Sequence, residues 1–148
     1  MNDLRDLYQE VILDHNQRPR NVGRLPVVSH QAVGHNPLCG DEVTIYLRVE
    51  NGVIEEAKFE GSGCAISTAS ASMMTEAVKG RPVADVEKLF RKFREVALGR
   101  AEADEGELGE LAALSGVCEY PVRVKCATLP WHALEAALSG SSSKVSTE

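Results

Sequence analysis

Residues 42–61, EVTIYLRVENGVIEEAKFEG, carry the clearest structural signal in the chain. Apolar side chains alternate with polar ones over the first eight residues, which is the period of a strand with one buried face. Asn51 and Gly52 follow as the favoured two-residue hairpin turn, and residues 53–61 return as a second strand. The stretch therefore predicts an antiparallel hairpin.

The segments around the hairpin complete a small antiparallel sheet that is covered by helices on one face. We expect a third strand in the region from Leu25 to Val33. Apolar residues recur at helical spacing in four segments, residues 3–14, 65–80, 82–99 and 121–138. An antiparallel sheet of this kind leaves one face to solvent, so these helices are expected to cover the other.

Other parts of the chain are expected to depart from regular structure. Pro130 is predicted to kink or interrupt the last helix, because proline lacks the backbone N–H that a helix interior uses. The acidic, glycine-bearing residues 101–111 predict an exposed loop or short helix. Residues 140–148 have no apolar content to bury, which predicts a disordered tail after a single domain over residues 1–139.

Charge and hydropathy exclude several classes of partner. With 22 acidic and 16 basic side chains, the net charge of −6 disfavours nucleic acid and anionic membrane surfaces. Charges interrupt the first residues, so no signal peptide is expected, and no apolar run approaches a membrane span. We therefore expect a cytoplasmic protein, in which cysteines serve as metal ligands or reactive thiols more often than as disulfides.

Three cysteines and one aspartate are candidate metal ligands. Cys39 and Asp41 flank a glycine in the motif NPLCGD, which lets both side chains face one ion. Cys64 follows two glycines at a strand-to-helix junction, where unpaired amide hydrogens favour a thiolate, and Cys126 lies in the first turns of the last helix. Three thiolates and a carboxylate complete a tetrahedral zinc shell. Spacing alone is equally compatible with separate buried cysteines that bind no metal, and with an Asp41 that only stabilises a turn.

Four motifs in order resemble the U-type iron–sulfur cluster assembly family, which includes IscU and the N-terminal domain of NifU, and its SufU branch in particular. They are DHNQRPRNVG at 14–23, NPLCGD at 36–41, GSGCAIS at 61–67 and RVKCATL at 123–129. The resemblance extends from Tyr8 almost to Leu138. It implies a compact α+β domain with helices packed on a three-stranded antiparallel sheet, and a metal site at one exposed end.

The same resemblance implies a ligand set and an activity. Cys39, Asp41, Cys64 and Cys126 correspond to the ligands of Zn²⁺ in SufU-like proteins. Such proteins accept sulfur from the persulfide of a SufS-like, pyridoxal-phosphate-dependent cysteine desulfurase and supply downstream scaffold proteins. Cys39 is the expected acceptor, because it lies on the glycine-containing loop, and the resemblance suggests that a desulfurase histidine replaces it on the metal.

Departures from IscU-like members favour the SufU branch. IscU-like members have a histidine immediately before the last cysteine, whereas this chain has Lys125 there. It also carries a longer insert over residues 81–116. Arg123 and Lys125 lie within one helical turn of Cys126, so they are candidate cations beside a negatively charged site, or simply a solvated helix face.

Two other functions stay open at this point. The same ligands can hold a [2Fe–2S] cluster in a scaffold protein, or a purely structural zinc ion in an interaction module. Cys118 matches no ligand of the family and is interpreted as a small buried residue. His15, at the end of the first helix, is interpreted as a capping or packing residue.

Overall fold

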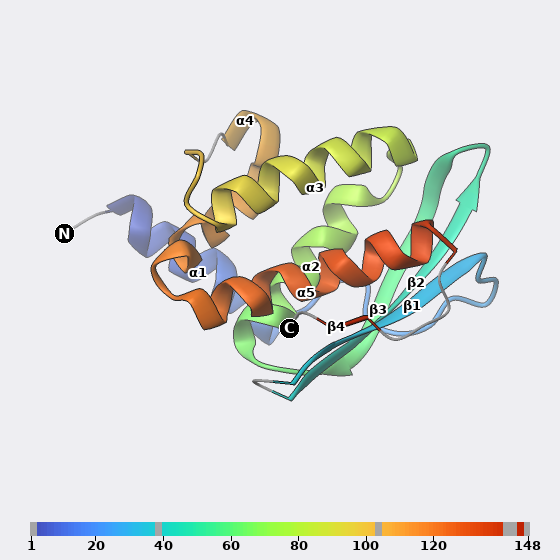
Figure 1. The fold of residues 1–148 in the computed structure, drawn as a ribbon, viewed down its shortest axis with the longest axis horizontal. Coiled ribbons are helices and arrows are strands. Elements are labelled where there is room, and N and C mark those ends of the chain that lie inside the picture. Colours follow the sequence, from blue (N-terminus) through green and yellow to red (C-terminus); the bar gives the residue numbers. More distant parts are fainter. Residues whose placement is uncertain (1–2, 38–39, 103–104, 141–144, 147–148) are drawn as a thin grey trace.

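Three antiparallel strands form the centre of the sheet, as predicted (Figure 1). The computed structural model describes residues 3–37, 40–102, 105–140 and 145–146. Strands β1 (His30–Asn36), β2 (Asp41–Glu50) and β3 (Val53–Ser62) lie in the order β3-β2-β1. The two-residue strand β4 (Val145–Ser146) pairs in parallel with β1 at the edge of the sheet. The α+β class is confirmed.

The predicted hairpin is formed by β2 and β3. Its turn places Asn51 at φ 53° and Gly52 at φ 76°, the left-handed conformation that this type of two-residue turn requires at both positions. Val43, Ile45 and Leu47 point to one face and are buried. The alternation in the sequence therefore marks the face of the sheet that packs against helices.

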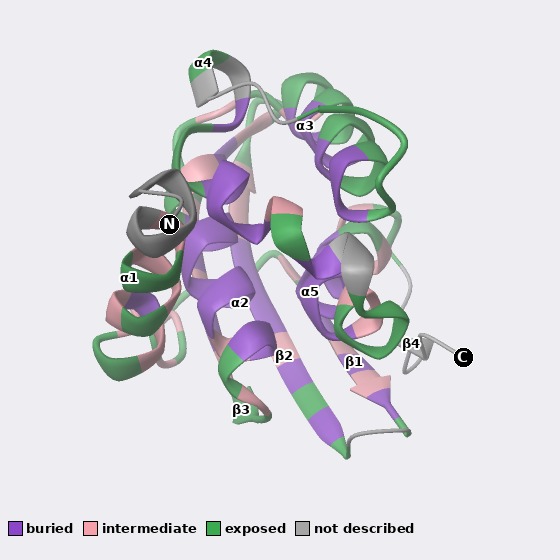
Figure 2. Cartoon of the chain, turned by 90° about the vertical axis from the view of Figure 1, so that its left-hand side faces the viewer, coloured by how far each residue is buried: buried purple, intermediate pink, exposed green. Residues whose placement is uncertain are grey.

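The helices form two layers on that buried face (Figure 2). Their bounds are α1 Asp3–Gln17, α2 Ala65–Val78, α3 Val83–Ala97, α4 Glu105–Leu108, the 3-10 helix η1 Gly109–Glu119 and α5 Pro121–Leu138. Helices α2 and α5 contact the sheet directly, and α1, α3 and η1 pack outside them. None of the described helices is long and apolar enough to cross a membrane.

An aromatic cluster joins α3 to α5 in the outer part of the core. Trp131 of α5 is fully buried and stacks on Phe90 and Phe93 of α3, with ring centroids 5.6 Å and 5.2 Å apart. Stacked aromatic rings at such distances add to the free energy gained by burying their area. The third predicted helix is thus confirmed with its apolar face turned inwards.

The third strand lies further along the chain than predicted. It begins at His30 instead of near Leu25, and it runs to Asn36. Pro26 has no N–H to donate to a strand ladder, and the next side chain, Val27, is 64% exposed. The strand consequently leads directly into the motif that contains Cys39.

Helix α5 continues through Pro130, so the predicted interruption is wrong. Tertiary packing holds the helix together at this point. Gly34 of β1 leaves the space that α5 fills: a Cβ there would lie 3.0 Å from Leu129 Cδ1 and 3.2 Å from Ala133 Cβ. Close packing on both sides of the proline outweighs the helical hydrogen bond that its missing N–H removes.

The segment over residues 101–111 is only partly the exposed loop or short helix that was predicted. Helix α4 is short, but Leu108 and Leu111 are buried in the core. The following helix η1 continues this buried surface, so the insert contributes to the core of the domain. Most of the predicted disordered tail lies outside the described residues, and its described part includes β4.

Candidate metal centre

The connection between β1 and β2 places Asp41 beside the end of β1. Asn36 and Asp41 are paired across the two strands, and the backbone N–H of Gly40 donates to the Asn36 carbonyl at 2.8 Å. Asp41 is buried, with 2% of its surface exposed. Cys39, predicted as a ligand and as the sulfur acceptor, lies outside the described residues. Its nearest described neighbours, Pro37 and Gly40, are exposed.

Cys64 lies between β3 and α2 and caps the N-terminus of that helix. Its backbone is extended, with φ −73° and ψ 171°, and its Sγ accepts the backbone N–H of Ser67 at 3.4 Å. The Ser67 hydroxyl donates back to the Cys64 carbonyl at 3.2 Å. The Cys64 sulfur therefore pairs with one of the backbone N–H groups that the start of a helix leaves without a partner.

Cys126 reaches the same place from the second turn of α5. It is 2% exposed, and its Sγ accepts an N–H of the Asn36 side-chain amide at 3.7 Å. Helix α5 packs along β1, and this packing brings together two residues that are 90 positions apart. Three separate segments of the chain thus meet at one point.

These side chains lie close enough together to hold a single metal ion. The ligand atoms of Asp41, Cys64 and Cys126 all lie within 4.8 Å of one another. Asp41 Oδ1 accepts the backbone N–H of Cys64 at 2.8 Å, and Oδ2 lies 3.6 Å from Cys64 Sγ. In a tetrahedron with Zn–S of about 2.3 Å and Zn–O of about 2.0 Å, the edge between sulfur and oxygen is about 3.5 Å. Thiolate ligands also suit zinc better than magnesium or calcium.

The two predicted cations beside the ligands have different surroundings. Arg123 is exposed, and its guanidinium carbon lies 5.8 Å from the centre of the Tyr120 ring. Lys125 is half-buried, in the residue before Cys126. Both residues lie within one helical turn of Cys126, and their role as cations beside the site stays a prediction.

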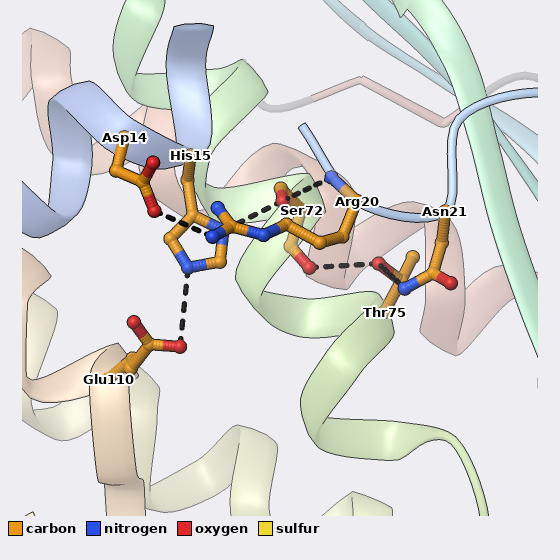
Figure 3. A network of polar contacts seen from close by, with 7 residues as sticks. All are labelled: Asp14, His15, Arg20, Asn21, Ser72, Thr75 and Glu110. Atoms are coloured by element: carbon orange, nitrogen blue, oxygen red, sulfur yellow. Dashed lines mark hydrogen bonds and ion pairs between the residues drawn. The ribbon is translucent and has the colours of Figure 1, made fainter. Parts of the chain in front are cut away.

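The motif DHNQRPRNVG forms a polar network at the end of α1, apart from the candidate ligands (Figure 3). His15 is 1% exposed, and its Nδ1 lies 2.7 Å from Ser72 Oγ. The same oxygen also accepts the backbone N–H of Arg20 at 2.8 Å. His15 Nε2 lies 3.3 Å from a carboxylate oxygen of Glu110. These contacts support the packing role assigned to His15.

Two residues of the centre carried no signal that sequence reasoning used. Gly63 leaves no room for a side chain, since a Cβ there would lie 2.4 Å from Ser67 Oγ and 3.0 Å from Asp41 Oδ1. Asn36 is fully buried and contacts Cys126. Asn36 belongs to the motif NPLCGD and Gly63 to the motif GSGCAIS. Their membership of these motifs could have indicated a role in the centre.

The fold and this cluster define an α+β domain with a candidate site for a metal ion, made by two thiols and a carboxylate. The chain belongs to the family of NifU-like N-terminal domains, whose model matches residues 7–139. The resemblance to the U-type iron–sulfur cluster assembly family is thereby confirmed.

Relatives of known name support the same family. The zinc-dependent sulfurtransferase SufU of Bacillus subtilis is 42% identical over 139 residues, which cover 93% of this chain and 92% of that protein. The iron–sulfur cluster assembly scaffold protein IscU of Thermotoga maritima is 42% identical over 132 residues, covering 89% and 92%. Both the SufU and the IscU type are therefore represented at similar identity.

Solved structures share the fold over nearly the whole chain. A candidate iron–sulfur cluster assembly scaffold protein of the SUF system from Fervidobacterium islandicum superimposes with a TM-score of 0.82 at 37% identity, covering 87% of this chain and 94% of that one. A NifU-like N-terminal domain from Brucella abortus gives a TM-score of 0.83 at 25% identity, covering 91% and 94%. The arrangement of helices on the sheet is thus that of the family.

Proposed function

We propose that this chain is a zinc-dependent sulfur acceptor in iron–sulfur cluster assembly, which takes sulfur from the persulfide of a SufS-like, pyridoxal-phosphate-dependent cysteine desulfurase. The observation that carries the proposal is the gathering of Asp41, Cys64 and Cys126 within 4.8 Å, beside the connection that contains Cys39. Family membership supports the assembly pathway, and the relative named as a zinc-dependent sulfurtransferase supports the ion and the reaction.

In this proposal Cys39, Asp41, Cys64 and Cys126 hold the zinc ion. Bound zinc keeps coordinated thiols deprotonated at neutral pH. Three thiolates and one carboxylate around a divalent cation leave a formal charge of about −2, so nearby cations are favourable. Arg123 and Lys125 are the residues to which we assign that compensation.

Cys39 is the residue to which we assign the transfer of sulfur. Its thiolate attacks the outer sulfur of the desulfurase persulfide, and a new S–S bond forms to Cys39 while the S–S bond of the persulfide breaks. The electron pair of the broken bond leaves with the desulfurase cysteine as a thiolate, and the transferred sulfur keeps its proton. The exchange needs no external oxidant or reductant. The exposure of Pro37 and Gly40 supports access of a partner to this loop.

The product of this exchange, a persulfide on Cys39, has to be passed on. We propose that downstream scaffold proteins of cluster assembly receive the sulfur. Free thiols persist in a reducing compartment, where glutathione and thioredoxin systems oppose disulfide formation. The proposal therefore places the chain in the cytoplasm.

Assembly of a [2Fe–2S] cluster on the same ligands is the second candidate function. It is supported by the relatives that are named as scaffold proteins, including the one from Thermotoga maritima. Cysteine and carboxylate ligands can hold iron and sulfide as well as zinc. Aerobic purification separates the two functions: colourless protein with stoichiometric zinc supports sulfur transfer, whereas brown protein with iron and labile sulfide supports the scaffold.

Replacement of the acceptor tests the proposed function directly. Cys39→Ser is expected to abolish stimulation of the desulfurase, because a serine hydroxyl has a far higher pKa than a thiol and cannot take up sulfur at neutral pH. The measurement is sulfide release by the desulfurase with cysteine as substrate. Mass spectrometry of the wild-type chain after the reaction is expected to find one added sulfur, about 32 Da, on the peptide that contains Cys39.

Cys118→Ser is the matched control, since it makes the same atomic change at a cysteine outside the proposed ligand set. It is expected to keep most of the stimulation. If Cys39→Ser stays active and the added sulfur appears on Cys64, Cys118 or Cys126, the assignment of Cys39 is wrong. If no cysteine gains sulfur and Cys39→Ser changes nothing, the sulfur-acceptor function is wrong, and a structural zinc module becomes the hypothesis to test by metal analysis.

A further inference from the structure

Asn36 connects the loop of the candidate centre to helix α5. It is the last residue of β1 and is fully buried. Its backbone carbonyl accepts the N–H of Gly40 at 2.8 Å and so closes the connection that contains Cys39. Its side-chain amide donates to Cys126 Sγ at 3.7 Å. One residue therefore contacts a candidate ligand in α5 and the backbone of Gly40, the residue before Asp41.

Each described ligand of the centre receives an N–H donor. Cys64 Sγ accepts the backbone N–H of Ser67, and Asp41 Oδ1 accepts the backbone N–H of Cys64. Both of these donors come from the start of α2, where helix geometry leaves backbone N–H groups unpaired. Cys126 lies inside a helix, where neighbouring N–H groups are used by the helix itself. The Asn36 side chain supplies a hydrogen-bond donor to its sulfur.

The chemistry of a carboxamide suits this position. An N–H donor stabilises the charged form of a thiolate and lowers its basicity, whereas a carboxylate in the same place would repel it. The amide is also neutral, so it adds no charge to a buried site. Its nitrogen donates to the sulfur while the backbone carbonyl of the same residue accepts the Gly40 N–H.

We infer that Asn36 is a positioning residue of the metal centre, which orients Cys126 and tunes its thiolate while its backbone carbonyl holds Gly40 beside Asp41. The inference rests on the metal binding in the proposed function, and it is independent of sulfur transfer. Groups that hydrogen-bond to metal ligands fix the orientation of the ligands and adjust how strongly they donate to the metal.

Asn36→Ala tests this role in the Co²⁺-substituted and Zn²⁺-loaded protein. Loss of the N–H donor raises the energy of the sulfur lone pair, so the sulfur-to-cobalt charge-transfer band is expected at longer wavelength. Release of zinc to a chromophoric chelator is expected to be about tenfold faster, the lower end of the range for partners of metal ligands. An unchanged band together with an unchanged release rate would overturn the inference.

Asn21→Ala is the matched control. The Asn21 amide donates to Thr75 Oγ1 at 3.1 Å and also links a loop to α2, but it contacts no candidate ligand. This variant is expected to lose stability without any shift of the charge-transfer band. A shift of the same size in both variants would show that Asn36 acts only through general stability, which contradicts the inference.

The wild-type chain loaded with ¹¹³Cd provides a test that needs no folded variant. Scalar coupling across an N–H···S–Cd path is expected between ¹¹³Cd and a side-chain amide proton of Asn36, and also between ¹¹³Cd and the backbone proton of Ser67. Coupling to Ser67 without coupling to Asn36 refutes the inference and leaves metal binding intact. A chain that binds neither cadmium, cobalt nor zinc refutes the proposed function itself.

Discussion

At residue 63, a single methyl group is expected to disturb the candidate metal centre. The Cβ of Gly63→Ala would lie 2.4 Å from Ser67 Oγ and 3.0 Å from Asp41 Oδ1, so one of these side chains has to move. Because Asp41 is buried and held by the Cys64 N–H, its displacement weakens a ligand. We expect zinc affinity to fall by about tenfold or more, with a loss of about 1–3 kcal/mol in unfolding free energy. Chelator competition and chemical denaturation measure the two effects.

Gly116→Ala is the control for this substitution. Gly116 has nothing within 4 Å of the added Cβ and lies in η1, away from the centre. It is expected to keep the zinc affinity and the stability of the wild-type chain. If Gly63→Ala binds zinc as tightly as Gly116→Ala does, the contact between residue 63 and Asp41 has no influence on the metal site.

Single residues of the centre differ in how far the sequence could predict them. Cys64 was predictable because a cysteine after two glycines at a strand-to-helix junction is a local pattern. Asn36 and Gly63 were not, because their roles depend on contacts made only in the folded chain, 90 positions away for Asn36 and 22 residues away for Gly63. A local pattern cannot indicate which distant side chain fills the space beside it.

Among the elements, the packing of α3 against α5 predicts a pH-dependent contribution to stability. His132 of α5 meets the Phe90 ring edge-on, with centroids 5.4 Å apart. Burial lowers the pKa of His132 below its ordinary value of 6.5, and the Arg94 charge acts in the same direction, against Glu135. As the pH falls, the unfolded chain therefore binds a proton at His132 at a higher pH than the folded chain does. The stability that neutral His132 contributes is present above pH 6.5 and is lost as the pH falls below it.

His132→Gln is expected to remove this part of the pH dependence. Unfolding free energy is measured by denaturant titration at pH 7.5 and pH 5.5 in both proteins. The wild-type chain is expected to lose more stability between the two pH values than the variant does. The other three histidines are common to both proteins, so they cancel in the comparison. Equal losses would show that His132 titrates alike in the folded and unfolded chain.

Elements also show where sequence reasoning stops. The β2–β3 hairpin was predictable because its alternation and its turn are both local. The continuity of α5 through Pro130 and the buried surface of η1 were not, because tertiary packing decides both of them. From the sequence alone, a short segment with apolar residues and acidic neighbours fits an exposed loop as well as it fits a buried helix. Only packing against the rest of the core decides between the two.

At the scale of the whole molecule, irregular segments protect the edge of the sheet at β3. The backbone of Phe59 exchanges two hydrogen bonds with residues 21–23, at 2.8 Å and 3.0 Å. Further along β3, Ile54 donates to the Arg81 carbonyl at 2.9 Å. Backbone groups that are paired in this way cannot form a sheet with another chain. The family motifs thus serve both the fold and the candidate centre.

The candidate centre joins the three parts of this fold, so removal of its metal is expected to lower the stability of the entire domain. Asp41 comes from the sheet, Cys64 from the start of α2 and Cys126 from α5, and the unfolded chain cannot bring these ligands together. With free zinc a hundredfold above Kd, binding adds about 2.7 kcal/mol to the unfolding free energy. For a chain of this size we expect the melting temperature to fall by about 5–10 °C when the metal is removed by a chelator. Cys126→Ser is the control, since it lacks a ligand and its melting temperature is expected to be the same with and without zinc. If the wild-type chain melts at one temperature in both states, with removal verified by metal analysis, the three segments are held together by packing alone and zinc is not a structural link between them.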